Sequence, residues 1–148
     1  MSVIAWDGTH IAADKQSTVS DIRMTTTKMR RLKSGEIAAW TGSQECGLIL
    51  ARWYEEGADS HRWPEFQKDK ENWTRLIIVS SEGAFFFEMQ PVAQVVEDQF
   101  MAWGSGRDFA MGALAQGATA KEAVAIANRL CTTCGLGIDV YDTTRHHQ

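Results

Sequence analysis

Pairs of short apolar runs separated by turn residues limit most strongly how this chain can fold. The first pair begins at Val3, where residues 3–6 and 9–13 flank Asp7-Gly8, a dipeptide that favours two-residue hairpin turns. The start of the chain is therefore predicted to lie in a sheet, although most domains leave their first residues loose. Two explanations stay open: the strand simply completes a sheet, or the terminus carries a reactive group.

Two further hairpins are predicted downstream. Their strands and turns are, in order, residues 25–32, 33–36 and 37–41, then residues 75–79, Glu82-Gly83 and residues 84–87. Another strand or two is expected between Val92 and Trp103, and a last strand over residues 137–141.

Three segments carry the start and stop signals of helices. Ser43 is a candidate N-cap, and Ser105 and Thr119 each begin a capping-box pattern. The predicted helices run over residues 44–56, from Ser105 to Gly117, and from Thr119 to about Cys134. Runs of strands with helices inserted between them indicate an α+β fold of packed sheets and helices.

The size and charge of the chain narrow its class. Its 148 residues, 44% of them hydrophobic, suit one domain over residues 1–148 with a buried core. The net charge of -4 gives no reason to expect binding to nucleic acid or an anionic membrane. No window approaches the roughly 18 apolar residues of a membrane span, and no leader pattern precedes the first strand. We therefore expect a cytoplasmic protein.

The strand pairing of the first hairpin places polar groups at one end. If Asp7-Gly8 is the turn, positions whose numbers sum to 15 face each other. Ser2 then lies opposite Ala13 and beside Asp14. The end of the hairpin away from its turn would carry the chain terminus, a hydroxyl and a carboxylate.

The second hairpin repeats this arrangement. If Ser34-Gly35 is its turn, positions that sum to 69 are paired, so Lys28 lies opposite Thr41 and next to Gly42. If the polar ends of both hairpins meet, they bring together a nucleophile, a base, a cation and an amide donor.

This set of groups fits hydrolysis by a terminal residue. Removal of Met1, which precedes a small residue, exposes the α-amine of Ser2, and an amine can accept the proton of the hydroxyl on the same residue. A free α-amine has a pKa of about 8, and the Lys28 cation nearby would lower it. The Gly42 N–H could donate to the developing oxyanion, while Asp14 would hold Lys28 in place.

Five segments in this order resemble a known family. They are residues 2–6, residues 12–14, residues 28–32, Thr41-Gly42-Ser43 before a helix and Gly104-Ser105-Gly106 before another. The chain resembles the N-terminal-nucleophile (Ntn) hydrolases of the proteasome β-subunit and HslV type, closest to small bacterial and phage-encoded members. The resemblance implies a four-layer αββα sandwich of two antiparallel sheets, peptide-bond hydrolysis and assembly into rings.

The resemblance also assigns roles to single residues. Ser2 is expected to be the nucleophile and its α-amine the base. Asp14 and Lys28 resemble the charged pair of the family, and Gly42 its oxyanion donor. Ser105 resembles the serine that orients the terminal amine.

Substrate and partner expectations follow from the same resemblance. Trp40 is expected to line the specificity pocket, with Thr26 and Ser43 also in contact with substrate. The expected partners are a peptide or unfolded protein as substrate and further copies of the chain. An ATP-dependent unfoldase is a candidate partner, and no cofactor or metal is expected.

The sequence departs from this family at several points. Most relatives begin with threonine rather than serine, and the region after the first helix is shorter than in ring-forming peptidases. Several relatives place an Asp and a Ser three apart before the last strand, where this chain has Cys131-Thr132-Thr133-Cys134. We interpret the two cysteines as small buried thiols, since one CxxC supplies only half of a structural zinc site. A catalytically inactive member that serves in assembly or binding remains the alternative function.

Overall fold

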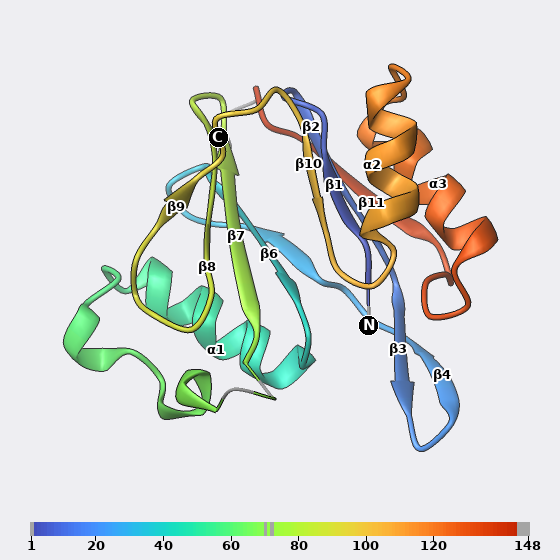
Figure 1. Cartoon of the computed structure of the whole chain (residues 1–148). Coiled ribbons are helices and arrows are strands. Elements are labelled where there is room, and N and C mark those ends of the chain that lie inside the picture. Colours follow the sequence, from blue (N-terminus) through green and yellow to red (C-terminus); the bar gives the residue numbers. More distant parts are fainter. Residues whose placement is uncertain (1, 70, 72, 145–148) are drawn as a thin grey trace.

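The computed structural model describes residues 2–69, 71 and 73–144. Two antiparallel sheets pack face to face, and helices cover their outer faces (Figure 1). One sheet has the order β10-β1-β2-β11, and the other β5-β6-β7-β8-β9. Helices α2 (Arg107–Ala115) and α3 (Ala120–Leu130) lie on the first sheet, and α1 (Gln44–Glu55) lies on the second. The predicted four-layer αββα sandwich is confirmed.

The strands of the two sheets are short. The first sheet contains β1 (Ile4–Trp6), β2 (His10–Asp14), β10 (Met101–Trp103) and β11 (Ile138–Asp142). The second contains β5 (Met29–Arg31), β6 (Ile37–Thr41), β7 (Arg75–Ser80), β8 (Gly83–Phe87) and β9 (Gln94–Val95).

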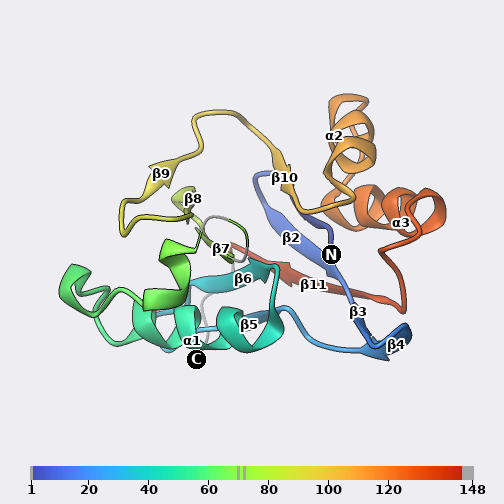
Figure 2. The ribbon, with the colours of Figure 1, turned by 60° about the horizontal axis from the view of Figure 1, so that its bottom comes forward.

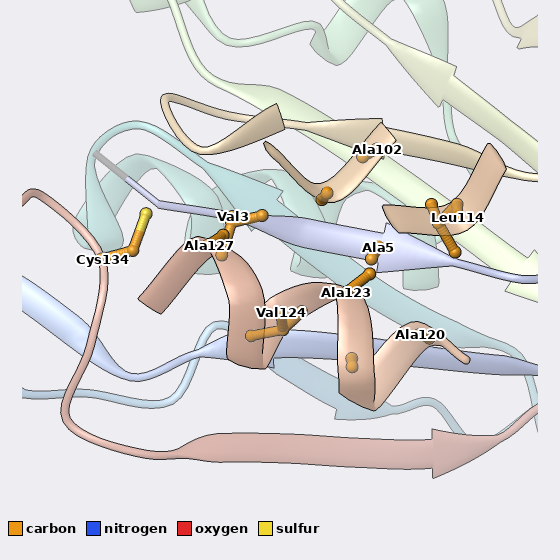
Figure 3. Close-up of a cluster of buried hydrophobic side chains, with 11 residues drawn as sticks. Val3, Ala5, Ala102, Leu114, Ala120, Ala123, Val124, Ala127 and Cys134 are labelled. Carbon is orange, nitrogen blue, oxygen red and sulfur yellow. The ribbon is translucent and has the colours of Figure 1, made fainter. Parts of the chain in front are cut away.

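Three clusters of buried side chains fill the three spaces between the layers. Val3 and Ala5 pack against apolar residues of α2 and α3 (Figure 3), and Ala12 of β2 belongs to the same cluster. A second cluster, which includes Ile4 and Ile77, joins the two sheets, and a third joins the second sheet to α1. Successive residues of a strand face opposite layers, so β1 supplies both the first and the second cluster.

The first hairpin has a different register from the one predicted. Ile4 pairs with Ala13, so paired positions sum to 17 rather than 15, and Ser2 does not face Ala13. The Asp7 carboxylate accepts hydrogen bonds from the backbone N–H groups of Thr9 and His10, which creates a longer turn than Asp7-Gly8 alone. Because the shift is two residues, every side chain keeps its predicted face.

The second hairpin is shifted by one residue. Arg31 pairs with Ile37, so paired positions sum to 68, and the carbonyl of Lys28 accepts a hydrogen bond from Trp40 N rather than pairing with Thr41. The connection spans three residues and uses Gly35 at φ 94°, a conformation that favours glycine. The third hairpin is confirmed, but its turn is Ser81-Glu82 rather than Glu82-Gly83, because Ser80 pairs with Gly83.

The helices follow their predicted signals with one exception. Ser43 Oγ accepts from Cys46 N at the start of α1, and Thr119 and Glu122 form a complete capping box at the start of α3. The capping box predicted at Ser105 is wrong, since the N-cap of α2 is Gly106 and no side chain caps this helix. The Ser105 hydroxyl makes other hydrogen bonds, described below. Helix α3 ends at Leu130, before Cys134.

A small hairpin that the sequence did not predict extends beyond the sandwich. Strands β3 (Gln16–Val19) and β4 (Ile22–Thr25) pair only with each other, and Figures 1 and 2 show them projecting below the start of β1. Two short 3₁₀ turns (Ser60–Arg62 and Glu65–Lys68) lie between α1 and β7. Within the described ranges, the helices are too short to cross a bilayer.

Candidate active site

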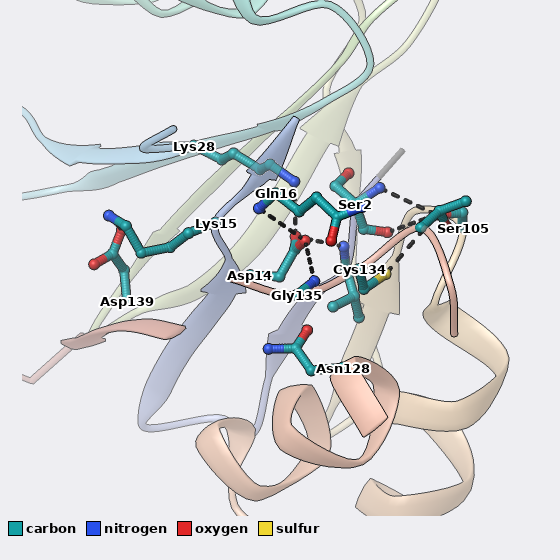
Figure 4. A network of polar contacts seen from close by, with 12 residues as sticks. Ser2, Asp14, Lys15, Gln16, Lys28, Ser105, Asn128, Cys134, Gly135 and Asp139 are labelled. Atoms are coloured by element: carbon teal, nitrogen blue, oxygen red, sulfur yellow. Dashed lines mark hydrogen bonds and ion pairs between the residues drawn. The ribbon is translucent and has the colours of Figure 1, made fainter. Parts of the chain in front are cut away.

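Ser2 lies buried at the start of β1, between the two sheets. Its backbone nitrogen donates to Ser105 Oγ at 3.1 Å, and its carbonyl accepts from Gly106 N at 3.1 Å (Figure 4). Gly104 passes so close that an added Cβ would lie 2.2 Å from the Ser2 carbonyl oxygen, so this position requires glycine. Among the described residues, no group forms a hydrogen bond with Ser2 Oγ. The hydroxyl is therefore held in place by its backbone, with its own hydrogen bonds unused.

Asp14, at the end of β2, connects the groups around Ser2. Its fully buried carboxylate accepts from Lys28 Nζ at 2.8 Å and from Val3 N at 3.0 Å. It also accepts from Gln16 N at 3.2 Å and Gly135 N at 3.1 Å. A buried carboxylate is costly unless its oxygens are satisfied, and here four donors satisfy them.

Lys28 crosses from the second sheet to the first. Its side chain is 6% exposed, and its ammonium group reaches the Asp14 carboxylate beside Ser2 (Figure 4). Ser105 lies on the other side of Ser2 in the same view. The structure thus brings Ser2, Asp14, Lys28 and Ser105 together, although the predicted strand registers were wrong.

Gly42 lies directly after β6 and lines the same pocket as Lys28. Its φ of 102° favours glycine, and an added Cβ would lie 3.1 Å from Thr74 Oγ1. Gly42 lines a pocket of about 360 Å3 together with Thr26, Lys28 and Ser43. The projecting β3–β4 hairpin and the first residues of α1, Gln44 and Glu45, complete the lining of this pocket.

Trp40 is not among the residues that line this pocket. It is buried in the core between the second sheet and α1, because alternate residues of β6 face that layer. Its ring packs on Gly47 of α1, where an added Cβ would lie 2.1 Å from the indole. Its Nε1 donates to Gln44 Oε1 at 2.8 Å, so Trp40 supports a pocket residue rather than the pocket surface.

The segment after α3 supplies site residues that the sequence analysis did not single out. Thr133 Oγ1 lies 2.8 Å from Ser105 Oγ and 3.1 Å from Cys131 Sγ. Gly135 N donates to Asp14, as described above. The one sequence signal for residues 131–134 was that relatives have an Asp and a Ser three positions apart there. In this chain those two positions are cysteines, so the signal did not indicate the threonine between them.

The two thiols of this segment have opposite properties. Burial and the nearby Asp14 charge raise the pKa of Cys134 to about 12. Burial alone would also raise the pKa of Cys131, but hydrogen bonds from Thr133 outweigh it and hold this pKa below the ordinary value. In the part of the chain that is described, His, Cys, Asp and Glu form no cluster that could hold a metal ion.

Comparisons with known proteins support the fold. No family model and no curated protein matches the sequence. Eukaryotic HslV from Trypanosoma brucei is 20% identical, with 95% of this chain and 97% of that chain covered and a TM-score of 0.72. Thiobacillus denitrificans BPH is 21% identical over 97% of this chain and 99% of that chain, also with a TM-score of 0.72. The same protein in complex with Epoxomicin gives 19% identity, 97% and 99% coverage and a TM-score of 0.70. The chain therefore has the Ntn-hydrolase fold of HslV.

Proposed function

We propose that this protein is a serine-type Ntn peptidase in which Ser2, freed by the removal of Met1, cleaves peptide bonds. Met1 itself lies outside the described residues. One observation carries the proposal: a buried lysine–aspartate pair and Ser105 meet at Ser2, next to an open pocket. The likeness to HslV and to a protein solved with Epoxomicin supports the same function.

The Ser2 amine acts as the general base in this mechanism. A free α-amine has a pKa of about 8, and it must be neutral to accept a proton. A lysine cation ~4 Å from a charged amine would repel it by roughly 4 kcal/mol at an effective dielectric constant of about 20, which favours the neutral form. Asp14 keeps Lys28 oriented, and Ser105 accepts an N–H of the amine. The lone pair of the amine is then free for the hydroxyl proton of Ser2.

Bond cleavage proceeds through an ester. Ser2 Oγ attacks the substrate carbonyl as its proton moves to the amine, and the Gly42 N–H donates to the resulting oxyanion. Such a donor contributes about 3 kcal/mol. The amine returns the proton to the leaving nitrogen, and the C–N bond breaks. Water then attacks the ester, gives a proton to the Ser2 hydroxyl and releases the acid.

The pocket beside Gly42 is the proposed substrate site. Thr26 and Ser43 contribute polar groups to its lining, and Met24 contributes an apolar one. Its wall includes the β3–β4 hairpin, whose exposed backbone suits an extended peptide or unfolded segment. We propose peptides or unfolded proteins as substrates, with an ATP-dependent unfoldase as a candidate supplier.

Mass spectrometry tests this function directly. The purified chain should lack Met1, and a peptide vinyl sulfone should add its whole mass at Ser2 as the hydroxyl oxygen bonds to the vinyl carbon. Ser2→Ala should show no adduct and no peptidase activity, while Ser81→Ala, in the exposed turn between β7 and β8, should react like wild type. Retained Met1, or an unreactive Ser2 after its removal, would favour the inactive assembly protein instead.

A further inference from the structure

We propose that Thr133 and Cys131 are positioning residues, which hold the Ser2 amine through Ser105 in a hydrogen-bond relay that ends on a sulfur atom. The proposal rests on the proposed function, because the relay matters to catalysis only if the Ser2 amine is the base. Its members come from three separate parts of the chain: the start of β1, the loop before α2 and the loop after α3.

The first link lies between Ser2 and Ser105. Ser2 N donates to Ser105 Oγ at 3.1 Å, so the serine oxygen uses one acceptor site for the amine. The single proton of Ser105 has two oxygen acceptors within reach, Thr133 Oγ1 at 2.8 Å and the Ser2 carbonyl at 3.3 Å. Because the contact to Thr133 is much the shorter, it is the better hydrogen bond.

The second link lies between Thr133 and Cys131. When Thr133 accepts from Ser105, its own proton is free for another acceptor, and Cys131 Sγ lies 3.1 Å away. A thiolate is a stronger acceptor than a thiol, and hydrogen bonds to a charged acceptor are about twice as strong as neutral ones. The donors then all point one way, from the Ser2 amine to the sulfur.

Because every donor in the relay points toward the sulfur, Ser105 acts as an acceptor of the amine N–H. The lone pair of the Ser2 amine, which is the base, therefore faces away from Ser105. If Thr133 lost its hydroxyl, the Ser105 proton would divide between the Ser2 carbonyl at 3.3 Å and the amine lone pair, and a bond to the lone pair would prevent the amine from acting as base. Cys134 cannot replace Thr133 well, because its sulfur lies 3.9 Å from Ser105 Oγ.

The neighbouring threonine provides a matched control. Thr132 is exposed, and its hydroxyl makes no hydrogen bond in the described part of the chain. We expect Thr133→Val, which keeps the side-chain shape, to lower kcat at least 10-fold with KM within about two-fold of wild type. Thr133→Ser should keep at least half of kcat, and Thr132→Val should behave as wild type. Similar melting temperatures of the two valine variants would show that both fold.

A second readout does not depend on activity. Loss of the Thr133 hydroxyl removes a donor to Cys131, so Thr133→Val should slow alkylation of Cys131 by iodoacetamide at pH 7 several-fold relative to Thr132→Val. Peptide mass spectrometry measures this rate.

The two readouts separate the relay from the proposed function. If the wild type is active and the two valine variants have equal kcat, the relay is refuted. An inactive wild type refutes the proposed function instead, and equal alkylation rates in the two variants would then refute the relay as well.

Discussion

Asp14 is the residue on which the candidate site depends most. Its carboxylate joins the backbone of Val3, the cation of Lys28 and the loop at Gly135, and so ties both sheets to the segment after α3. A more exposed ion pair of the same residue types joins Lys15 to Asp139 at 2.8 Å, and Lys15 Nζ also donates to Thr27 Oγ1. The distance from Nζ to the carboxylate oxygen is 2.8 Å in both pairs, but the Lys28–Asp14 pair is more buried. A comparison of the two pairs therefore tests the effect of burial.

Loss of the Lys28 ammonium should abolish catalysis and weaken the fold. Lys28→Met leaves the Asp14 charge buried without its cation, which costs about 3–5 kcal/mol of unfolding free energy in such cases. Lys15→Met breaks a partly exposed pair and should cost at most about 1 kcal/mol. Urea denaturation measures both. Vinyl sulfone labelling of Ser2 should disappear in Lys28→Met and persist in Lys15→Met, and persistent labelling in both would assign Lys28 a structural role only.

The thiols should differ in reactivity. Alkylation requires the thiolate, so the lowered pKa of Cys131 means that its reaction begins at a lower pH than that of an ordinary thiol. Cys134, with a pKa raised to about 12 and a buried sulfur, should stay unmodified in the folded protein at pH 8. Peptide mapping over a pH series measures both rates, with the urea-unfolded chain as the control. Faster labelling of Cys134 than of Cys131 would contradict these assignments.

At the scale of elements, turn chemistry limited what the sequence could predict. The hairpins, α1 and α3 follow from periodicity and capping signals, and these were identified correctly. The predicted register of the first hairpin was wrong because the Asp7 carboxylate accepts hydrogen bonds from Thr9 N and His10 N. That of the second was wrong because Gly35 ends a three-residue loop. Both turns depend on side-chain and backbone details.

The candidate site was only partly predictable. Ser2, Asp14 and Lys28 lie at strand ends that hairpin arithmetic brings close, even with a small error in register. Thr133 meets Ser105 across 28 positions of sequence, and nothing local to either residue indicates the contact. Trp40 lies in the core between the second sheet and α1, and its part in substrate specificity stays a prediction.

Two helical glycines should respond in opposite ways to alanine. Gly47 of α1 packs against the Trp40 ring, where an added Cβ would lie 2.1 Å away, so Gly47→Ala should destabilise the protein by about 1–3 kcal/mol through overpacking. Gly112 of α2 has open space at that position, so Gly112→Ala should stabilise it by about 0.5–1 kcal/mol. Thermal unfolding measures both changes. A stabilised Gly47→Ala would mean that Trp40 moves freely.

At the scale of the whole molecule, the four layers bury their inner faces but leave apolar residues exposed on several outer elements, among them β4 and α1. Ile22 of β4 is 68% exposed, and Leu48 and Ile49 of α1 are 43% and 39% exposed. The β3–β4 hairpin has no third strand, and a two-stranded hairpin is marginally stable alone. Contact with another copy of the chain would cover these groups.

We therefore expect a homo-oligomer. Light scattering at micromolar concentration should give a multiple of the chain mass. Ile22→Asp and Leu48→Asp together should reduce that mass, because a charge in a buried contact is unfavourable. Lys121→Asp, on the outer surface of α3, is the control. A wild-type protein with the mass of a single chain would disprove the expectation.

The strand order of the first sheet also sets the order in which Ser2 acquires its neighbours during synthesis. The central strands β1 and β2 are made first, whereas their outer partners β10 and β11 are made last. Chains emerge from the ribosome at about 5–20 residues per second, so Ser105 and Gly135 are synthesised several seconds after Ser2. During that time the terminus is an open strand to which a processing enzyme has access. The nascent chain therefore carries Ser2, the proposed nucleophile, from the beginning and gains the residues that position it only near the end.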